Sequence, residues 1–443
     1  MKKLERYIKE KYDGANYWFV EEIQSIHNQH LVQDVWIKKE YLNGSHKILN
    51  RASYKYNGKE FNPRKIVLQY AKTLLNFQKA YLLQNPLTLT GNEEVIKEYQ
   101  RVNRKGKYDR LNLKLLDKIL KYGRVAEYIY MDKGGIKSKL IDPSEGYPVY
   151  DENNELLAFI ESFVCDGISY YIVYEEEVVS RYDNAGGDMR LVQRFANLSG
   201  LPIVYHNDNE MSEVEGRSEL DDWISILDSM EDLISKYTDS FYKFIDPIFV
   251  TQGQQLKGEA LPSEVIGKGI NLDDGADAKF LSNQLDYKSF ETIYKTLLQS
   301  LLDVSQTPAV SMNRTDISNL SEVSIKLLFQ LANIKAGMNE QFLREGLEER
   351  FEKIRILLGY KGIKFSDEEF ETIDVVFQYA TPSNDKEIIE NLQALREMGA
   401  ISLIGVLEDS PYTSDVQFEL DRIVKEGNSV GNNSGDEDNE AYR

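Results

Sequence analysis

The stretch Ser218–Ile245, SELDDWISILDSMEDLISKYTDSFYKFI, decides the fold of this chain. Its large apolar residues recur at alternating gaps of three and four: Leu220, Trp223, Leu227, Met230, Ile234, Tyr237, Phe241 and Phe244. Such a heptad seam predicts one long helix that buries an apolar stripe. At 1.5 Å per residue the helix would be about 40 Å long.

Two further long helices follow the first. The second has its seam at Phe290, Tyr294, Leu297, Leu301 and Val304. The third is predicted over 319–360, more than about 50 Å, with Asn319 and Glu322 as a capping-box-like start. Globular helices average about 11 to 12 residues. These lengths are typical of a helical-bundle core, of a dimeric coiled coil, or of a subunit that packs against its copies, and periodicity leaves the three open.

Composition narrows the class of protein. The 443 residues include 73 Asp and Glu against 53 Lys and Arg, a formal charge of −20. Tight binding of nucleic acid needs a cationic face, although a protein that surrounds DNA without gripping it is compatible with this charge. Cys165 is the only cysteine, which excludes an internal disulfide and suits a reducing compartment. No apolar run approaches a transmembrane length, so we expect no membrane segment.

The rest of the chain is predicted to be mainly helical, with a β-rich segment in the middle. Helices are expected over 1–40, from Asn62-Pro63 to about Leu83, within 94–122, over 384–398 up to Gly399, and over 414–426. Strands are expected at 127–131, 156–163, 170–174, 190–194, 203–205, 248–251, 279–281 and 375–379, and a short helix near 262–266. Residues 427–443 have the composition of a disordered acidic tail. The predicted fold class is therefore α+β, mainly helical.

The sequence contains no recognisable set of catalytic residues. Gly253–Gly258 has the glycine spacing of a phosphate loop, but Glu259-Ala260 follows where Lys and Ser or Thr are required. His27 and His30 lie three residues apart, yet no nearby Cys or carboxylate pattern completes a metal site, which favours a surface or core role. We therefore predict no enzyme, no cofactor and no metal.

A basic segment departs from the acidic background. Between residues 97 and 124 the candidate surface residues are Arg101, Arg104, Lys105, Lys107, Arg110, Lys114 and Lys118. A solvated helix face, a contact with an acidic face of a neighbouring copy, and direct DNA binding remain three alternatives.

The connection 306–318 is polar and lacks apolar periodicity. A structureless loop of this length inside a compact unit is usually functional or disordered. Gln306, Asn313, Arg314, Thr315 and Asp316 are the candidates there for contact with DNA, and Arg314 is the only cation in the loop.

Between about Ile37 and Glu426 the chain resembles the portal proteins of long-tailed bacteriophages, the head-to-tail connectors. Tyr41–Leu49 is similar to the family's Tyr-x-x-Gly-x-His-x-Ile segment, and Tyr81–Pro86 to the end of the next helix. Similar motifs follow in the family's order: Gly123–Tyr130 with Asp142-Pro143, Leu201–Tyr205, Ser218–Leu220, Thr307-Pro308, Asn319–Lys326 and Glu419–Ile423. Glu322 and Ser324 depart from the family's usual Ser-Gly-Val-Ala.

The resemblance implies an outer wing, a stem, a clip and a crown. By analogy the wing is 1–217 with the long helix 319–360, the stem helices are 218–245 and 287–304, the clip is 246–286, the tunnel loop is 305–318 and the crown is 361–426.

The resemblance also implies partners. Portal subunits form a ring, usually of twelve, around a channel for double-stranded DNA at one capsid vertex. The clip faces the terminase large subunit and later a head-completion or adaptor protein, and Gln254, Lys257, Glu259, Glu264 and Lys268 are the candidate residues. Capsid and scaffold proteins are further partners, the virion is the location, and the host bacterial cytoplasm is the place of assembly. The alternative function is a helical coiled-coil scaffold without a DNA channel.

Overall fold

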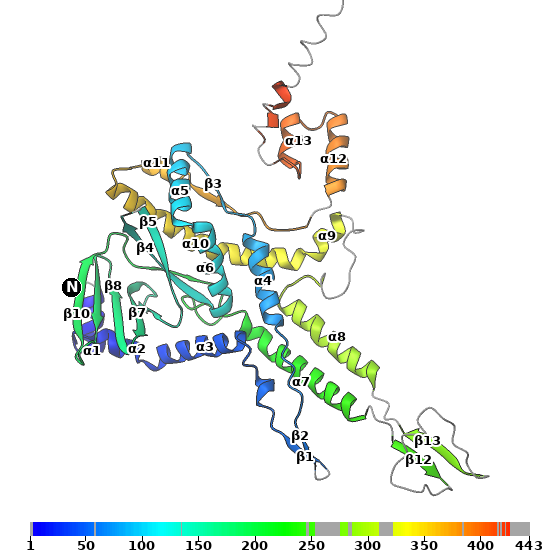
Figure 1. The fold of residues 1–443 in the computed structure, drawn as a ribbon. Coiled ribbons are helices and arrows are strands. Elements are labelled where there is room, and N and C mark those ends of the chain that lie inside the picture. The colour runs from blue at the N-terminus through cyan, green and yellow to red at the C-terminus, as the bar shows by residue number, and fades with distance from the viewer. Residues whose placement is uncertain are drawn as a thin grey trace, which may run out of the picture. The chain divides into compact units, whose positions relative to one another are not determined.

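The computed structural model describes residues 3–56, 59–133, 135–244, 248–252, 275–281, 286–309, 322–382, 385–413, 416, 419–420 and 422–425. The chain forms two compact units. Unit 1 contains residues 1–307 and 334–379, and unit 2 contains residues 308–333 and 380–443. Figure 1 shows the elements in chain order.

Unit 1 contains most of the helices. They are α1 (Lys3–Tyr12), α2 (Trp18–Ile23), α3 (Ile26–Leu42), the 3₁₀ helix η1 (Lys47–Asn50), α4 (Tyr70–Leu83), α5 (Glu93–Gly106), α6 (Tyr108–Tyr122), α7 (Leu220–Phe244), α8 (Tyr287–Val304), α10 (Gln330–Tyr360) from its residue 334 onward, and α11 (Asp367–Phe370). Unit 2 contains α9 (Glu322–Leu328), the first residues of α10, α12 (Asp385–Glu397) and α13 (Leu403–Asp409).

All strand pairs in the described residues are antiparallel. A five-stranded sheet has the order β10-β9-β8-β7-β6, and a three-stranded sheet has the order β11-β4-β5. Their strands are β4 (Arg124–Asp132), β5 (Gly135–Ile141), β6 (Gly146–Tyr150), β7 (Leu156–Cys165), β8 (Ile168–Tyr174), β9 (Val178–Asp183), β10 (Arg190–Ala196) and β11 (Ile203–His206). Two-stranded pairs join β1 (Tyr54–Tyr56) to β2 (Lys59–Phe61), β3 (Thr88–Thr90) to β14 (Asp374–Val376), and β12 (Ile248–Gln252) to β13 (Asp277–Leu281).

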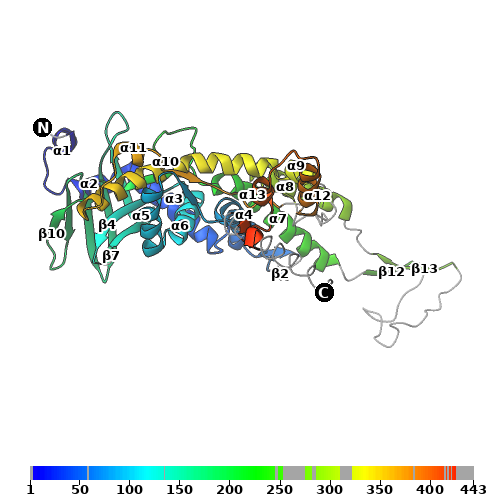
Figure 2. The same cartoon turned by 90° about the horizontal axis from the view of Figure 1, so that it is seen from above.

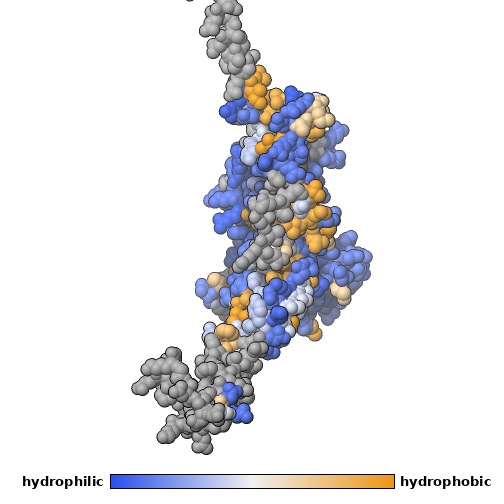
Figure 3. Space-filling model, turned by 90° about the vertical axis from the view of Figure 1, so that its right-hand side faces the viewer, coloured by the Kyte–Doolittle hydropathy of each residue, from blue (hydrophilic) through white to orange (hydrophobic). Residues whose placement is uncertain are grey.

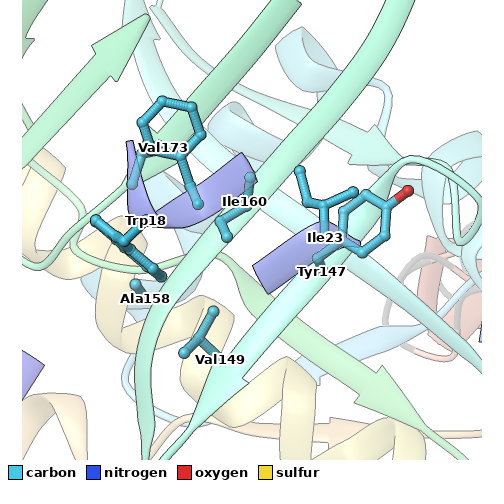
Figure 4. Close-up of a cluster of buried hydrophobic side chains, with 8 residues drawn as sticks. Trp18, Ile23, Tyr147, Val149, Ala158, Ile160 and Val173 are labelled. Carbon is cyan, nitrogen blue, oxygen red and sulfur yellow. The ribbon is translucent and has the colours of Figure 1, made fainter. Parts of the chain in front are cut away.

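The cores of unit 1 lie where helices and sheets meet. Helix α2 buries Trp18, Phe19 and Ile23 against the five-stranded sheet. Figure 4 shows Trp18 and Ile23 with Tyr147, Val149, Ala158, Ile160 and Val173. A second cluster joins the two sheets through Ala126, Tyr128, Ile141, Phe159, Tyr174 and Val179. Both follow from the β-rich pattern of the middle segment, because alternate residues of a strand face the same side.

The fold class is confirmed: helices and antiparallel sheets make an α+β protein. Strands are present at each predicted position in the middle segment, but β5, β6 and β9 were not predicted. The helical prediction over 1–40 is confirmed for most of this range, which is divided into three helices. Asp13 and Gly14 have left-handed backbones with φ of 51° and 77°. Ser25 then caps α3 by accepting from the Asn28 N–H, so the chain can turn and place α2 on the sheet.

Two other predicted elements differ in detail. The third long helix is divided into α9 and α10 at Phe329, although the Phe329 N–H still donates to the Ile325 carbonyl at 3.0 Å. Gly399 follows α12 with a φ of 70°, as expected for a residue that ends a helix. The predicted short helix near 262–266 and the acidic tail lie outside the described residues.

The surface of the described residues includes both polar and apolar areas. Figure 3 shows hydrophobic patches among mainly hydrophilic surface on one side of the protein. On α7 and α8 the large exposed apolar side chains are Phe241, Tyr242, Tyr287, Ile293 and Val304. In the part of the chain that the structure describes, no helix is long and apolar enough to span a membrane.

Candidate functional site

Helices α7 and α8 pack side by side, as their heptad seams predict (Figure 1). Trp223 and Met230 in the first half of α7 are fully buried, whereas Phe241 near its end is 45% exposed. The rings of Tyr237 and Phe290 stack with centroids 3.8 Å apart. The seam is therefore an internal core at one end of the pair and an apolar surface at the other.

An extended segment, residues 62–69, lies along α7 where a helix was predicted. The backbone N–H groups of Arg64, Ile66 and Leu68 donate to side chains of α7. Their acceptors are Asp239 Oδ1 at 2.9 Å, Ser235 Oγ at 3.1 Å and Glu231 Oε1 at 2.7 Å. Alternate residues of an extended chain thus meet every fourth residue of a helix. The predicted helix start at Asn62-Pro63 is wrong, because these contacts use the N–H groups that a helix would need, and α4 begins only at Tyr70.

A fully buried His46–Glu231 pair lies beside this segment. His46 Nδ1 is 2.6 Å from Glu231 Oε1, and neither side chain is exposed. The Tyr41 ring stacks on the His46 ring with centroids 3.9 Å apart. Burial is the largest cause of a raised pKa of Glu231, partly offset by the Leu68 N–H and by His46. The segment Tyr41–Leu49, which resembles the portal motif, is therefore held against α7 by His46.

The basic candidates lie on α5, on α6 and at the corner between them. Arg101, Arg104, Lys105, Lys107, Arg110 and Lys114 are exposed. Lys118 differs, because its Nζ lies 2.6 Å from Asp142 Oδ2 within the chain. Apart from a 3.6 Å approach of Arg101 to Glu98, the exposed six have no ion pair among the described residues. We call Arg101, Arg104, Lys105, Lys107, Arg110 and Lys114 the basic corner.

The side of α5 away from the basic corner faces α10. Tyr99 of α5 is fully buried, its hydroxyl donates to the Phe351 carbonyl at 2.7 Å, and its ring meets the Phe351 ring edge to face. Figure 2 shows α10 passing alongside α5 and α6. The basic corner is therefore exposed in the described part of the chain.

Most of the candidate residues of the tunnel loop and the clip lie outside the described residues. Asn313, Arg314, Thr315 and Asp316 of the loop lie outside the described residues, as do the clip candidates Gln254, Lys257, Glu259, Glu264 and Lys268. Gln306 is described: it follows α8 with a left-handed φ of 51°, and its N–H donates to the Asp303 carbonyl at 3.2 Å. The loop thus leaves α8 at a sharp turn.

The histidine pair in α3 makes no metal site with described residues. His27 Nε2 lies 2.5 Å from Glu215 Oε1 across the unit, and no group of three potential metal ligands occurs in the described part of the chain. This agrees with the surface role that the sequence favours for His27.

A polar pocket was missed by the sequence analysis. It measures about 180 Å³ and lies between α10 and the connection from β11 to α7. Its lining includes Asn207, Asp208, Glu210, Asp222, Lys335 and Asn339. The available signal was the run of acids after β11 and in the first turn of α7: Asp208, Glu210, Glu213, Glu215, Glu219, Asp221 and Asp222, with only Arg217 as a base. We call this the acidic pocket.

Two ion pairs and one buried, unsatisfied amide oxygen characterise its lining. Lys335 Nζ lies 2.5 Å from Glu219 Oε1, and the Arg217 guanidinium lies 2.5 Å from Asp222 Oδ1. Asn207 Oδ1 is buried without a hydrogen-bond partner. Asn339 is only 6% exposed, and its side chain makes no hydrogen bond to another described residue.

Comparison with known proteins assigns the chain to a protein family. The family described as "Phage portal protein, SPP1 Gp6-like" matches residues 22–432. The chain belongs to this family. The portal family is a structural one, and the match includes α7, α8, α10, the basic corner and the acidic pocket.

Individual relatives are distant. The curated "Portal protein" of Bacillus phage SPP1 is 22% identical over 407 residues, which cover 83% of this portal chain and 78% of the relative. The solved structure titled "Neck of empty GTA particle computed with C6 symmetry" is 10% identical, covers 75% of this chain and 86% of its own, and gives a TM-score of 0.48. "Neck of native GTA particle computed with C12 symmetry" is 11% identical, covers 77% and 89%, and gives 0.46.

Proposed function

We propose that this portal chain is the subunit of a ring at one vertex of a phage capsid, through which double-stranded DNA enters and leaves. The observation that carries the proposal is the family match from residue 22 to residue 432. The helix pair α7–α8 supports it, because its outer end exposes Phe241, Tyr242 and Tyr287 to potential neighbours. A formal charge of −20 also suits a channel through which DNA slides without being held.

We propose that successive segments of the chain form the regions of a portal subunit. Residues 1–217 with the long helix 319–360 are the wing, 218–245 and 287–304 the stem, 246–286 the clip, 305–318 the tunnel loop and 361–426 the crown. Residues 361–379 belong to unit 1, where β14 pairs with β3, and residues from 380 onward belong to unit 2.

The partners that we propose follow the same division. The clip docks the terminase large subunit during packaging and a head-completion or adaptor protein afterwards. The wing contacts capsid and scaffold proteins, and the ring of about twelve copies assembles in the host bacterial cytoplasm before it becomes part of the virion. The tunnel loop with Arg314 contacts the moving duplex. The subunit has no nucleotide hydrolysis of its own, because Gly253–Gly258 lacks the lysine and hydroxyl of a phosphate loop.

The test is the oligomeric state of the purified full-length chain. Electron microscopy of negatively stained protein, together with mass photometry at moderate salt, is expected to show rings with a central hole and a mass many times the 51.1 kDa of one chain. A dominant monomer or dimer without a hole would instead support a helical coiled-coil scaffold.

A further inference from the structure

Among the described residues, only Arg101 of the basic corner has an ion-pair partner, Glu98 at 3.6 Å. The six side chains of the corner come from the end of α5, the start of α6 and Lys107 between them, where the backbone is left-handed with a φ of 55°. Two neighbouring acids are engaged elsewhere, since Asp117 binds Lys79 and Lys121, and Asp142 binds Lys39 and Lys118. Asp109 is exposed at the start of α6, beside Arg110 in the sequence. The corner therefore offers unpaired guanidinium and ammonium groups to an external partner.

The acidic pocket, in contrast, has carboxylates without a cationic partner among the described residues. Asp208 and Glu210 are exposed at its rim and have no ion pair among the described residues. Behind them, the Asn207 amide is already engaged, since its Nδ2 donates to the Arg217 carbonyl and its Oδ1 lies against Gly216. The free carboxylates of Asp208 and Glu210 favour an occupant that brings N–H groups and positive charge.

The size of the pocket agrees with a side chain as occupant. A cavity of about 150 Å³ admits a benzene molecule, and this one measures about 180 Å³. A planar guanidinium carries five donors and suits carboxylate and amide oxygens together.

We propose that the acidic pocket receives the basic corner of a second copy of this chain, with Arg104 and Lys105 as the side chains that approach Asp208 and Glu210. The proposal rests on the proposed ring and names the residues that join its neighbours. Pocket and corner share no residue, so the contact is head to tail, and each copy uses its corner on one neighbour and its pocket on the other. Such a contact generates a closed ring when the rotation between copies closes.

The experiment reverses the charge of the basic corner and of the acidic pocket, first separately and then together, in the full-length chain. Arg104→Glu/Lys105→Glu places acid against acid, and Asp208→Lys/Glu210→Lys places base against base. Each double variant is expected to raise the protein concentration at which rings dissociate by about tenfold or more, because like charges across an interface repel each other. The fourfold variant carries both reversals, so every interface regains opposite charges, and its rings are expected to recover most of the wild-type stability.

Mass photometry over a dilution and salt series gives the readout, and circular dichroism checks folding. The matched control is Lys9→Glu/Lys361→Glu, which makes the same change of charge at exposed sites outside the corner and is expected to leave the rings unchanged. Wild-type-like rings in both double variants would overturn the contact, and so would a fourfold variant that is no more stable than either double variant. If only binding of duplex DNA to the ring is lost in Arg104→Glu/Lys105→Glu, the corner binds DNA and the proposal is wrong. Absence of rings in the wild type would instead overturn the proposed function.

Discussion

Arg350 and Glu127 join elements of unit 1 that are 223 residues apart in the chain. The Arg350 Nε and Nη2 donate to Glu127 Oε2 at 2.9 and 2.7 Å, and the Tyr205 hydroxyl donates to the same oxygen at 2.7 Å. The Arg350 Nη1 donates to Asn112 Oδ1 at 2.6 Å. Burial lowers the pKa of Arg350, but the Glu127 carboxylate raises it and the net direction is upward. One guanidinium thus connects α10 to β4 and α6.

Arg350→Met is expected to lower the free energy of unfolding by roughly 3–5 kcal/mol, because it leaves the Glu127 charge buried and unpaired. Thermal and urea unfolding at a fixed protein concentration measure the change. Arg355→Met is the matched control on the same helix: its partner Asp367 is 84% exposed, so the expected loss is at most about 1 kcal/mol. Equal losses in the two variants would contradict the importance of the buried pair.

Asp142 gives a pH-dependent contribution at the residue scale. Burial raises its pKa, but hydrogen bonds from Lys118, Lys39 and Ser144 lower it, and the net direction is strongly downward. A carboxyl whose folded pKa lies below its unfolded value adds stability above that unfolded value, and this stability is lost as the pH falls.

Asp142→Asn is therefore expected to cost about 1–2 kcal/mol at pH 7 and progressively less below about pH 4, where the unfolded carboxyl takes up a proton. Urea unfolding at several pH values measures the difference. Asp132→Asn removes an ion pair of comparable distance at an exposed site and serves as the control with a much smaller pH dependence. A constant difference between Asp142→Asn and the wild type at every pH would disprove the linkage.

At the scale of elements, residues 62–69 show why local signals misplace a helix. Asn62 and Pro63 are typical of a helix start, and the residues after them have no helix breaker. Donors of this segment nevertheless bind Asp239, Ser235 and Glu231 of α7. The segment can be extended because a distant helix satisfies its backbone, which a window of neighbouring residues does not reveal.

Ser235→Ala tests this element. The substitution removes the acceptor of the Ile66 N–H in a buried position and is expected to cost about 1–2 kcal/mol of unfolding free energy. Ser229→Ala on the same helix is the control, since the Ser229 hydroxyl is exposed and donates only to the Ser225 carbonyl, and its expected effect is below about 0.5 kcal/mol. Faster amide exchange at Ile66 in Ser235→Ala alone would identify the lost bond directly.

At the scale of the whole molecule, the net charge and the tunnel loop bear on how the proposed ring contacts DNA. In the proposed ring, an acidic chain with a basic corner joins its copies at that corner, while its net negative charge disfavours tight binding of DNA. The proposed tunnel loop is the exception, because Arg314 would offer one cation per subunit to the phosphates. An exposed contact of this kind is weak, so a ring of them would guide a duplex without holding it.

Shortening the loop within 309–318, or Arg314→Glu, is expected to leave ring formation intact and to lower the amount of packaged or retained DNA. Arg314→Lys keeps the charge and is the control that should package normally. Ring mass and packaged DNA are measured on the same variants. Normal packaging by the shortened loop would refute the proposed channel role, and loss of rings would show that the segment is a structural joint.

The sequence by itself determined the elements whose signals are local and repeated. The seams of α7 and α8, five of the strands in the middle segment (β4, β7, β8, β10 and β11) and the glycine that ends α12 each depend on residues a few positions apart. The order of weak motifs identified the family. Only the tertiary structure decided the extended course of 62–69, the Arg350–Glu127 pair and the acidic pocket. Each of these joins residues more than a hundred positions apart, and a buried donor, charge or amide is satisfied or left unsatisfied only by what the fold places beside it.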